Sequence, residues 1–482
     1  MSERNETSLE SQLAELASRA QPSADGWQAI LARARRQDRR RRSAVAAALS
    51  FAVVVATIVV WPRLHPGNHG TGVSVASPTV AAPPGARSPG PAAWVSGNQL
   101  WVYSGSGALR PVTGSSPAAD PEWSYDGQWI SYLRGANTAH PELWVVRPDG
   151  SGNTEVWNGK PGGIEWSPTA EELAVSDTPA VGIGGLAIVT PNGTRQTVVP
   201  YSSEVNSFAW APDGQSIALS EVMAPADTFA SPLDIVTVHG PDAGRTTTVL
   251  RAGPDVGIAV GPWWPSGKGL LYWFEPQYSR SVEASGLTLM STTLAGTAPV
   301  TLATTLVSLP WLSWAPNGQL LVVSGSGAQP SDNKSLELCT PATGACTKVP
   351  TPADTVSLDP SVSPDGQQVA FVLASQSASA TSAWFATRRL WVFDLDNLAD
   401  AHAVAGASAG TALPSWGADG LTIGYSTATD VESIPAAGGK PTVVSGAAAL
   451  TGSTGLDGET ALGKTTWASH AVWAPASGWM AG

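Results

Sequence analysis

The sequence predicts an all-β chain folded as a β-propeller, a ring of four-stranded sheets called blades. Three observations predict this fold: a short motif that recurs at regular intervals, two alternating apolar strands after each copy of the motif, and many turn-forming residues. The 482 residues include 50 Gly and 39 Pro, a composition that favours tight turns over long helices.

The recurring motif has the form Trp-x-Pro-Asp-Gly, and its clearest copy is WAPDG at 210–214. Its first position recurs at intervals of 43, 44, 54, 50, 48 and 54 residues. A period of about 40 to 50 residues is typical of propeller blades. The motif residues, expected to pack between neighbouring blades, are Trp123, Trp166, Trp210, Trp264, Trp314 and Trp416, with Val362 in the equivalent place.

The remaining motif residues have a mechanical interpretation. Pro presets the first corner of a tight turn, Asp caps the turn with its side chain, and Gly takes the left-handed position. The Asp-Gly pair is lost in EWSPTA at 165–170, and Val replaces Trp at 362. Such losses suit a packing and turn motif better than a catalytic one.

Strands of alternating type follow each turn. WISYL (129–133) and SIALS (216–220) are first examples, and ELWVVRP (142–148) and LDIVTVH (233–239) are the strands that follow them. A turn and a weaker last strand complete each unit. Four short antiparallel strands per repeat are typical of a blade.

FAWAPDGQSIAL (208–219) and PSVSPDGQQVAF (360–371) resemble the TolB-like, WD-repeat-like propeller repeat. The resemblance covers about residues 115–445. Members of that family include periplasmic scaffolds, sensor ectodomains and the gating propellers of serine peptidases. The resemblance therefore implies a fold and leaves the activity open.

The two ends of the region 93–482 predict how the ring closes. Residues 94–114 resemble the second half of a blade, and WAPASG near the C-terminus is a degenerate first half. Joining them would build one blade from both ends and would leave no exposed sheet edge at the closure. This arrangement predicts eight blades; seven, with both ends packed alongside, is the alternative.

The N-terminal part predicts a membrane anchor. Residues 43–61 are nineteen residues without a charge, and seven Arg lie within 33–42. This pattern predicts a transmembrane helix over 43–62 with its N-terminus in the cytoplasm. A cleaved signal peptide and a buried core helix are the alternatives. Residues 63–92, rich in Pro, Gly, Ala and Ser, are expected to form a spacer to an extracytoplasmic propeller.

The cytoplasmic segment 1–42 is expected to be helical. It could bind a cytoplasmic partner and so signal, or it could lie on anionic lipid as an amphipathic entry to the anchor. The rest of the chain, from residue 63 on, carries seventeen basic against thirty-two acidic residues. Because phosphate backbones are bound through Lys and Arg, we expect no nucleic-acid partner.

Few residues indicate chemistry. Cys339 and Cys346 flank a hairpin turn and should form a disulfide outside the cytoplasm, with two free thiols as the alternative. No His accompanies them, so we expect no metal, and no motif indicates a cofactor. GASAG at 406–410 matches Gly-x-Ser-x-Gly, but a nucleophile elbow needs an α/β sheet that this chain lacks, so Ser408 is not expected to be catalytic.

The mouth of the propeller channel is the remaining candidate site. Counting three residues back from the motif position gives Asp120, Ser207, Trp311 and Asp359 as candidate binding residues. The alternative is that Asp120 and Asp359, each followed by Pro, cap turns that enter their strands. We expect a non-catalytic module that binds a protein, a peptide or an envelope glycan, as sensor or scaffold. The rival hypothesis is a glycan hydrolase or lyase with these two carboxylates as acid and base.

Overall fold

The computed structural model describes residues 90–106, 108–113, 117–135, 141–158, 161–177, 185–200, 204–222, 231–253, 256–276, 286–327, 329–449 and 472–473. The chain divides into two compact units, Met1–Ser77 and Pro78–Gly482, and every described residue belongs to the second. The predicted cytoplasmic segment, transmembrane helix and most of the spacer therefore lie outside the described residues. Among the described residues, no helix combines the length and the apolar character needed to cross a membrane.

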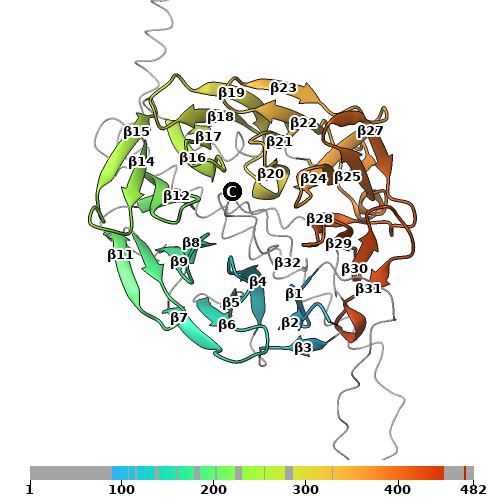
Figure 1. The fold of residues 1–482 in the computed structure, drawn as a ribbon, viewed down its shortest axis with the longest axis horizontal. Helices are drawn as coiled ribbons and strands as arrows, with labels where there is room; N and C mark the ends of the chain where they lie inside the picture. The colour runs from blue at the N-terminus through green and yellow to red at the C-terminus, as the bar shows by residue number, and fades with distance from the viewer. Residues whose placement is uncertain are drawn as a thin grey trace, which may run out of the picture. The chain divides into compact units, whose positions relative to one another are not determined.

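The described strands form eight four-stranded antiparallel sheets arranged as a ring (Figure 1). We number these blades 1 to 8 in chain order. The strands of blades 1 to 4 are β32 (Val472–Trp473), β1 (Ala92–Ser96), β2 (Gln99–Tyr103) and β3 (Leu109–Pro111); β4 (Ala118–Trp123), β5 (Ile130–Arg134), β6 (Glu142–Val146) and β7 (Thr154–Asn158); β8 (Pro161–Trp166), β9 (Leu173–Asp177), β10 (Leu186–Val189) and β11 (Arg195–Val199); and β12 (Glu204–Trp210), β13 (Ser216–Val222), β14 (Pro232–Thr237) and β15 (Thr246–Arg251).

Two 3-10 helices and one short α-helix accompany blades 5 to 8. The 3-10 helix η1 (Leu309–Trp311) precedes blade 6, α4 (Ser382–Phe385) lies between the second and third strands of blade 7, and η2 (Gly446–Ala448) follows blade 8. The strands are β16 (Val256–Trp263), β17 (Gly269–Pro276), β18 (Leu287–Thr293) and β19 (Val300–Thr305); β20 (Leu312–Trp314), β21 (Leu320–Ser324), β22 (Ser335–Thr340) and β23 (Ala345–Lys348); β24 (Thr355–Val362), β25 (Gln368–Ser375), β26 (Arg389–Asp394) and β27 (Asn397–Ala403); and β28 (Ala412–Trp416), β29 (Thr422–Ser426), β30 (Val431–Pro435) and β31 (Thr442–Val443).

The ring closes as the sequence predicts. The C-terminal strand β32 pairs antiparallel with β1, with Ala92 opposite Trp473 and Ala93 opposite Val472. Blade 1 is thus built from both ends of the region, and the blade number is eight. Trp473, from the degenerate motif WAPASG, occupies the place of the motif residue in this blade.

The motif turns confirm the mechanical interpretation. In blade 4, the Asp213 carboxylate accepts the N–H of Gln215 at 2.9 Å, and Gly214 has a φ of +65°. The N–H of Gly214 donates to the carbonyl of Ala211 at 2.9 Å and closes the turn. Gly is the residue that adopts this left-handed conformation without steric cost, which explains its recurrence.

The hydrophobic core lies between the blades. Eight clusters of buried side chains each combine residues of two successive blades, so both faces of every sheet are covered by a neighbour. The cluster of blades 7 and 8, for example, joins Val392 with Trp416 and Tyr425. Burial on both sheet faces explains why these short strands are more apolar than strands with one wet face.

The motif tryptophans connect each blade to the preceding one, with one correction. The indole N–H of Trp210 donates to the carbonyl of Glu165 at 3.2 Å, and that of Trp416 to Ser361 at 2.9 Å. In blade 5 the equivalent bond, to Ala209 at 3.1 Å, comes from Trp263. The prediction of Trp264 was wrong by one residue, because the innermost strand of this blade ends at Trp263.

Trp264 instead bonds within its own blade, where its indole N–H donates to the Ser291 hydroxyl at 3.0 Å. Trp166 follows the general rule and donates to Ser131 of the preceding blade at 3.0 Å. Trp123 and Val362 are buried at their interfaces. Trp314 packs against the cluster of blades 5 and 6, and its indole N–H has no hydrogen-bond partner.

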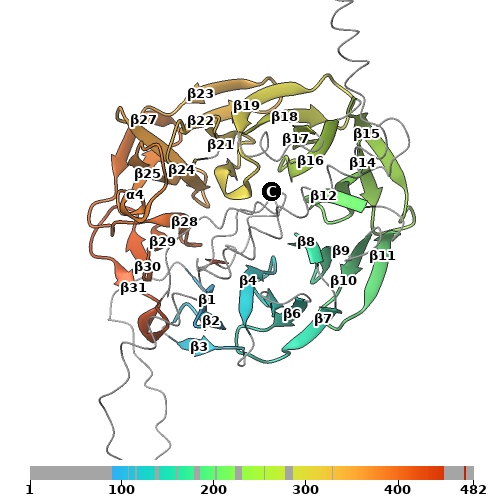
Figure 2. The ribbon, with the colours of Figure 1, turned by 180° about the vertical axis from the view of Figure 1, so that it is seen from behind.

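The antiparallel topology gives the ring two different faces. The connections between first and second strands and between third and fourth strands leave one face, which we call the turn face. The connections between second and third strands, and those between successive blades, leave the other, which we call the loop face. The loop face carries two long connections, of which the structure describes residues 325–327 and 329–334 of the first and all of 376–388, and α4 is part of the latter (Figure 2).

Candidate functional site at the rim of the channel

The four predicted rim residues belong to four different blades. Asp120 lies on β4 of blade 2, Ser207 on β12 of blade 4, Trp311 on η1 of blade 6 and Asp359 on β24 of blade 7. Of the four, the structure brings together Trp311 and Asp359, whose blades are neighbours.

Bulges in the innermost strands position Asp120 and Asp359. The pairing register shifts between Ala119 and Glu122 in blade 2 and between Leu358 and Ser361 in blade 7. Asp120 and Asp359 sit in these bulges with φ of 49° and 50°. The two residues therefore lie within bulged strands and do not cap turns at strand entry. A bulge bends the strand and re-aims a side chain.

Leu413 of blade 8 has the same backbone conformation, with a φ of 46° next to a register shift that follows Ala412. Like the two aspartates, Leu413 precedes a proline. A bulky residue with a positive φ is strained and persists only where its surroundings hold it. One such contact is known, because the N–H of Leu413 donates to an Asp359 carboxylate oxygen at 3.3 Å.

Asp359 is the centre of a buried ion pair. Its Oδ2 lies 2.9 Å from Nη2 of Arg388, and the two side chains are 2 % and 0 % exposed. Burial raises the pKa of the Asp359 carboxyl, while the Arg388 guanidinium, the Leu413 N–H and the Trp311 indole oppose that rise. Burial likewise lowers the pKa of the Arg388 guanidinium, against the effect of Asp359. This carboxylate therefore holds three blades together and is not presented to the channel.

Arg388 ends the loop 376–388, which the sequence analysis did not single out. The loop turns back through α4, where the Thr381 hydroxyl accepts the N–H of Trp384 at 3.2 Å as an N-cap. The guanidinium carbon of Arg388 lies 5.5 Å from the ring centre of Phe385 and 5.9 Å from that of Trp384. Within a run of small and polar residues, the pair Trp384-Phe385 was the one signal for a buried anchor here.

Ser207 also serves to join blades. Its hydroxyl oxygen accepts the N–H of Val260 in blade 5 at 2.7 Å and lies 3.0 Å from the hydroxyl of Ser220. Ser220 in turn donates to the carbonyl of Ile258 at 2.7 Å. Trp311 is 4 % exposed and belongs to the core between blades 6 and 7. Of the four predicted residues, only Asp120 is exposed.

The loop 325–334 contributes a second buried cation on the loop face. The ammonium of Lys334, a residue only 3 % exposed, donates to the carbonyls of Ser326, Gly327 and Asp332 at 2.9 to 3.0 Å. Burial lowers the pKa of this ammonium to about 8. Because all three donors are used, Lys334 organises its own loop and offers nothing to a ligand.

The two loops also bind each other. The N–H of Ser377 donates to the Ser331 carbonyl at 2.7 Å, and the Gln376 amide donates to the Asp332 carboxylate at 3.0 Å. The loops of blades 6 and 7 are thus joined on the loop face. Their two basic side chains, Lys334 and Arg388, are buried.

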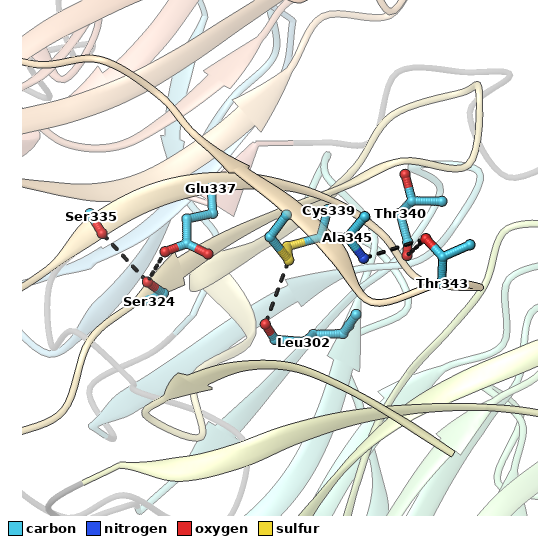
Figure 3. Close-up of a disulfide and its surroundings, with 9 residues drawn as sticks. Leu302, Ser324, Ser335, Glu337, Cys339, Thr340, Thr343 and Ala345 are labelled. Carbon is cyan, nitrogen blue, oxygen red and sulfur yellow. Dashed lines mark hydrogen bonds between the residues drawn. A yellow bond between two sulfur atoms is a disulfide. The ribbon is translucent and has the colours of Figure 1, made fainter. Parts of the chain in front are cut away.

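Cys339 and Cys346 form a disulfide between directly opposed residues of β22 and β23 (Figure 3). Among the described residues, Glu337 and these two cysteines are the one acidic or sulfur cluster with metal-ligand spacing, but sulfurs joined to each other are not thiolate ligands. The carboxylate of Glu337 accepts the Ser324 hydroxyl at 2.6 Å. The sulfur of Cys346 lies 3.5 Å from the Leu302 carbonyl oxygen, a contact without a proton.

Ser408 lies in a connector between blades 7 and 8. Its N–H donates to the hydroxyl of Tyr425 at 3.2 Å, and that hydroxyl donates to the Glu432 carboxylate at 2.7 Å. Burial is the main reason that the pKa of Tyr425 lies well above its usual value. The arrangement fixes the connector through its backbone, and the structure gives no base at the Ser408 hydroxyl among the described residues.

The chain matches no known protein family and no curated protein. Among solved structures it is similar to a puromycin hydrolase, with 16% identity over 69% of this chain and 56% of that one, at a TM-score of 0.44. TolB from Acinetobacter baumannii is 15% identical over 54% of this chain and 64% of its own, at 0.35. The chain therefore spans between half and two thirds of the length of these two proteins.

An oligogalacturonate lyase in complex with manganese is 14% identical, over 73% of this chain and 95% of that one, at a TM-score of 0.45. Both enzymes and a protein without an enzymatic name thus occur among these similar structures. At such identities and scores they contribute nothing to the choice of a function, which depends on the residues of the rim.

Proposed function

We propose that this chain is a membrane-anchored, extracytoplasmic β-propeller that acts as a non-catalytic binding module, a sensor or scaffold, for a protein, a peptide or an envelope glycan. One observation carries the proposal: two of the three polar rim residues hold neighbouring blades together. Asp359 accepts the N–H of Leu413 in blade 8, and Ser207 accepts the N–H of Val260 in blade 5. Hydrogen bonds between blades make the rim rigid, and a rigid surface is suited to binding a partner.

The same observation weighs against the rival hypothesis in its original form. A glycan hydrolase with Asp120 and Asp359 as acid and base needs both carboxylates in contact with substrate. Asp359 is 2 % exposed and lies beside a guanidinium at 2.9 Å. A hydrolase or lyase activity would have to use other residues of this chain.

The membrane anchor is supported by the sequence. The uncharged run 43–61 follows an Arg-rich segment, and an acidic, disulfide-containing propeller suits the outside of the cell. Fractionation of cells tests this part. The intact chain should stay with the membranes, and a mature form beginning beyond about residue 70 in the soluble fraction would contradict the anchor.

Photo-crosslinking in intact cells tests the binding function. A photoreactive residue is placed at Gln329, exposed on the loop face, and in a matched strain at Leu294, which is 43% exposed on the turn face. We expect a discrete adduct from one face and none from the other, which also identifies the binding face. Adducts from neither position would contradict the proposal.

An activity screen separates the binding module from an enzyme. The purified chain is incubated with envelope glycans and esters, alongside Asp120→Asn. Asp359→Ala is a poor probe, since it leaves Arg388 buried opposite a methyl group. Turnover by the purified chain would establish the enzyme instead, and its loss in Asp120→Asn with the fold kept would assign Asp120 to the reaction.

A further inference from the structure

The bulge that carries Asp120 in blade 2 has a close counterpart in blade 7, where it carries Asp359. In each blade an Asp-Pro pair of the innermost strand lies across from a single aromatic residue of the second strand, Tyr132 in blade 2 and Phe371 in blade 7. The two aspartates share one backbone conformation, with φ of 49° and 50°. The two carboxylates therefore start from equivalent positions of their blades.

The two blades differ in the cation that they supply to this position. In blade 7, Arg388 directly precedes the third strand, β26, and its Nη2 lies 2.9 Å from Oδ2 of Asp359. In blade 2 the residue that directly precedes the third strand, β6, is Pro141. The sequence of the whole connection 135–141 contains no Lys or Arg. Blade 2 thus keeps the bulged aspartate but has no arginine in the place of Arg388.

The exposure of the two aspartates follows this difference. Asp359 is 2% exposed, whereas Asp120 is exposed. Within the same molecule, Asp359 provides an example of a carboxylate in this bulge that accepts a hydrogen bond from a guanidinium. Hydrogen bonds between a guanidinium and a carboxylate are about twice as strong as those between neutral groups. An exposed carboxylate in the same backbone setting is accessible to a guanidinium of another molecule.

The charge of the chain favours a cationic partner. From residue 63 on, seventeen basic residues stand against thirty-two acidic ones. Two of the basic side chains, Lys334 and Arg388, are buried. A surface of negative net charge attracts cationic groups from a distance and repels anionic ones. A basic peptide therefore suits this protein better than an anionic glycan does.

We propose that Asp120 is the specificity residue of the binding module and pairs with an arginine side chain of a protein or peptide partner. The arginine takes on blade 2 the place that Arg388 takes on blade 7. This inference rests on the proposed binding function and names the partner class as an arginine-bearing peptide segment. A neutral glycan offers no cation to this carboxylate.

A pair of synthetic peptides tests the recognition of the guanidinium. The purified full-length chain is titrated into the fluorescent peptide Ala-Ala-Arg-Ala-Ala, or into the same peptide with citrulline, which keeps the shape of arginine and removes its charge. Asp120→Asn removes the carboxylate, and Asn adopts a positive φ as readily as Asp, so the bulge is kept. The matched control is Glu155→Gln, which removes an exposed carboxylate on β7, the outermost strand of the same blade.

We expect the parent to bind the arginine peptide at least about tenfold more tightly than the citrulline peptide. Asp120→Asn should lose this preference, and Glu155→Gln should keep it. Equal binding of both peptides by the parent, a preference that survives in Asp120→Asn, or no saturable binding of the arginine peptide up to about 10 mM would overturn the inference.

A second pair of variants keeps the test decisive if Asp120→Asn fails to fold. Pro141→Arg supplies a guanidinium from the position equivalent to Arg388, so it should occupy Asp120 and abolish the preference for the arginine peptide. Pro141→Gln makes the same backbone change without the charge and should keep the preference. If these two variants bind the arginine peptide alike, the inference is wrong.

The same variants in the photo-crosslinking strains separate this inference from the proposed function. Adducts that are lost in Asp120→Asn and kept in Glu155→Gln support both. Adducts that the two variants affect alike place the partner elsewhere, so the arginine site fails and the binding module stands. If the parent itself gives no adducts, the proposed binding function fails, and the peptide titrations alone judge the arginine site.

Discussion

The buried ion pair of blade 7 predicts a large and non-additive loss of stability. Arg388→Met leaves the Asp359 carboxylate at 2 % exposure without its cation. Breaking a buried pair on one side costs about 3–5 kcal/mol, because an uncompensated charge stays in the interior. Asp359→Leu should cost a similar amount, because it leaves the Arg388 guanidinium buried without its anion.

The double variant Asp359→Leu with Arg388→Met isolates the pair. It buries no unpaired charge, and its remaining loss is the acceptor of the Leu413 N–H and of the Trp311 indole, each worth about 1 kcal/mol. The sum of the single losses should therefore exceed the loss of the double variant by at least about 2 kcal/mol. Urea unfolding of the compact unit Pro78–Gly482, followed by tryptophan fluorescence, measures all three free energies.

The pH dependence of the free energy of unfolding provides a second measurement, and its direction is predicted. The guanidinium opposes the rise that burial causes in the pKa of Asp359, so Arg388→Met raises this pKa further. A carboxyl whose folded pKa lies above its unfolded value stabilises the fold less as pH rises through that interval. The deficit of Arg388→Met should thus be largest near neutral pH and shrink in acid.

The matched control is Arg389→Met, the same change at the adjacent and exposed residue. Its guanidinium donates to the carbonyls of Ala386 and Arg388 at 2.8 Å, so we expect a loss of about 1 kcal/mol or less. If Arg388→Met loses no more than this control, or if the single losses simply add, the buried-pair reasoning is refuted.

Three further outcomes follow from the packing. Lys334→Met should lose about 1–3 kcal/mol of unfolding free energy, since carbonyls of its loop lose their donor. The parent protein should gain stability between pH 8 and 10.5, because the folded pKa of Lys334, about 8, lies below the ordinary 10.5. Urea titrations in which the variant kept that gain would refute the assignment. Trp416→Phe should lose about 1 kcal/mol more stability than Trp314→Phe in thermal unfolding, because the indole N–H of Trp416 has a hydrogen-bond partner and that of Trp314 has none. Equal losses would argue against the inter-blade hydrogen bond of Trp416. Reducing the Cys339–Cys346 disulfide should cost about 2–3 kcal/mol in denaturation with and without reductant, and an unchanged midpoint would contradict this estimate.

The sequence by itself determined the repeating part of this protein. The blade period and the Pro-Asp-Gly turns are predicted from local patterns, and the half-blades at the two ends predict eight blades over the alternative of seven. Each depends on turn residues and alternation within one unit of about 49 residues. Local preferences of this kind act the same way in every copy, so the repeated pattern can be recognised in the sequence.

Only the tertiary structure decided the rim. Arg388 reaches Asp359 across 29 residues, and Val260 reaches Ser207 across 53. The first contact depends on the bulge in β24 and on the path of the loop 376–388, and the second depends on how blades 4 and 5 pack. The exchange of Trp264 for Trp263 arose in the same way, from where one strand ends. A local sequence pattern does not encode such details, because they result from how segments far apart in the chain pack together.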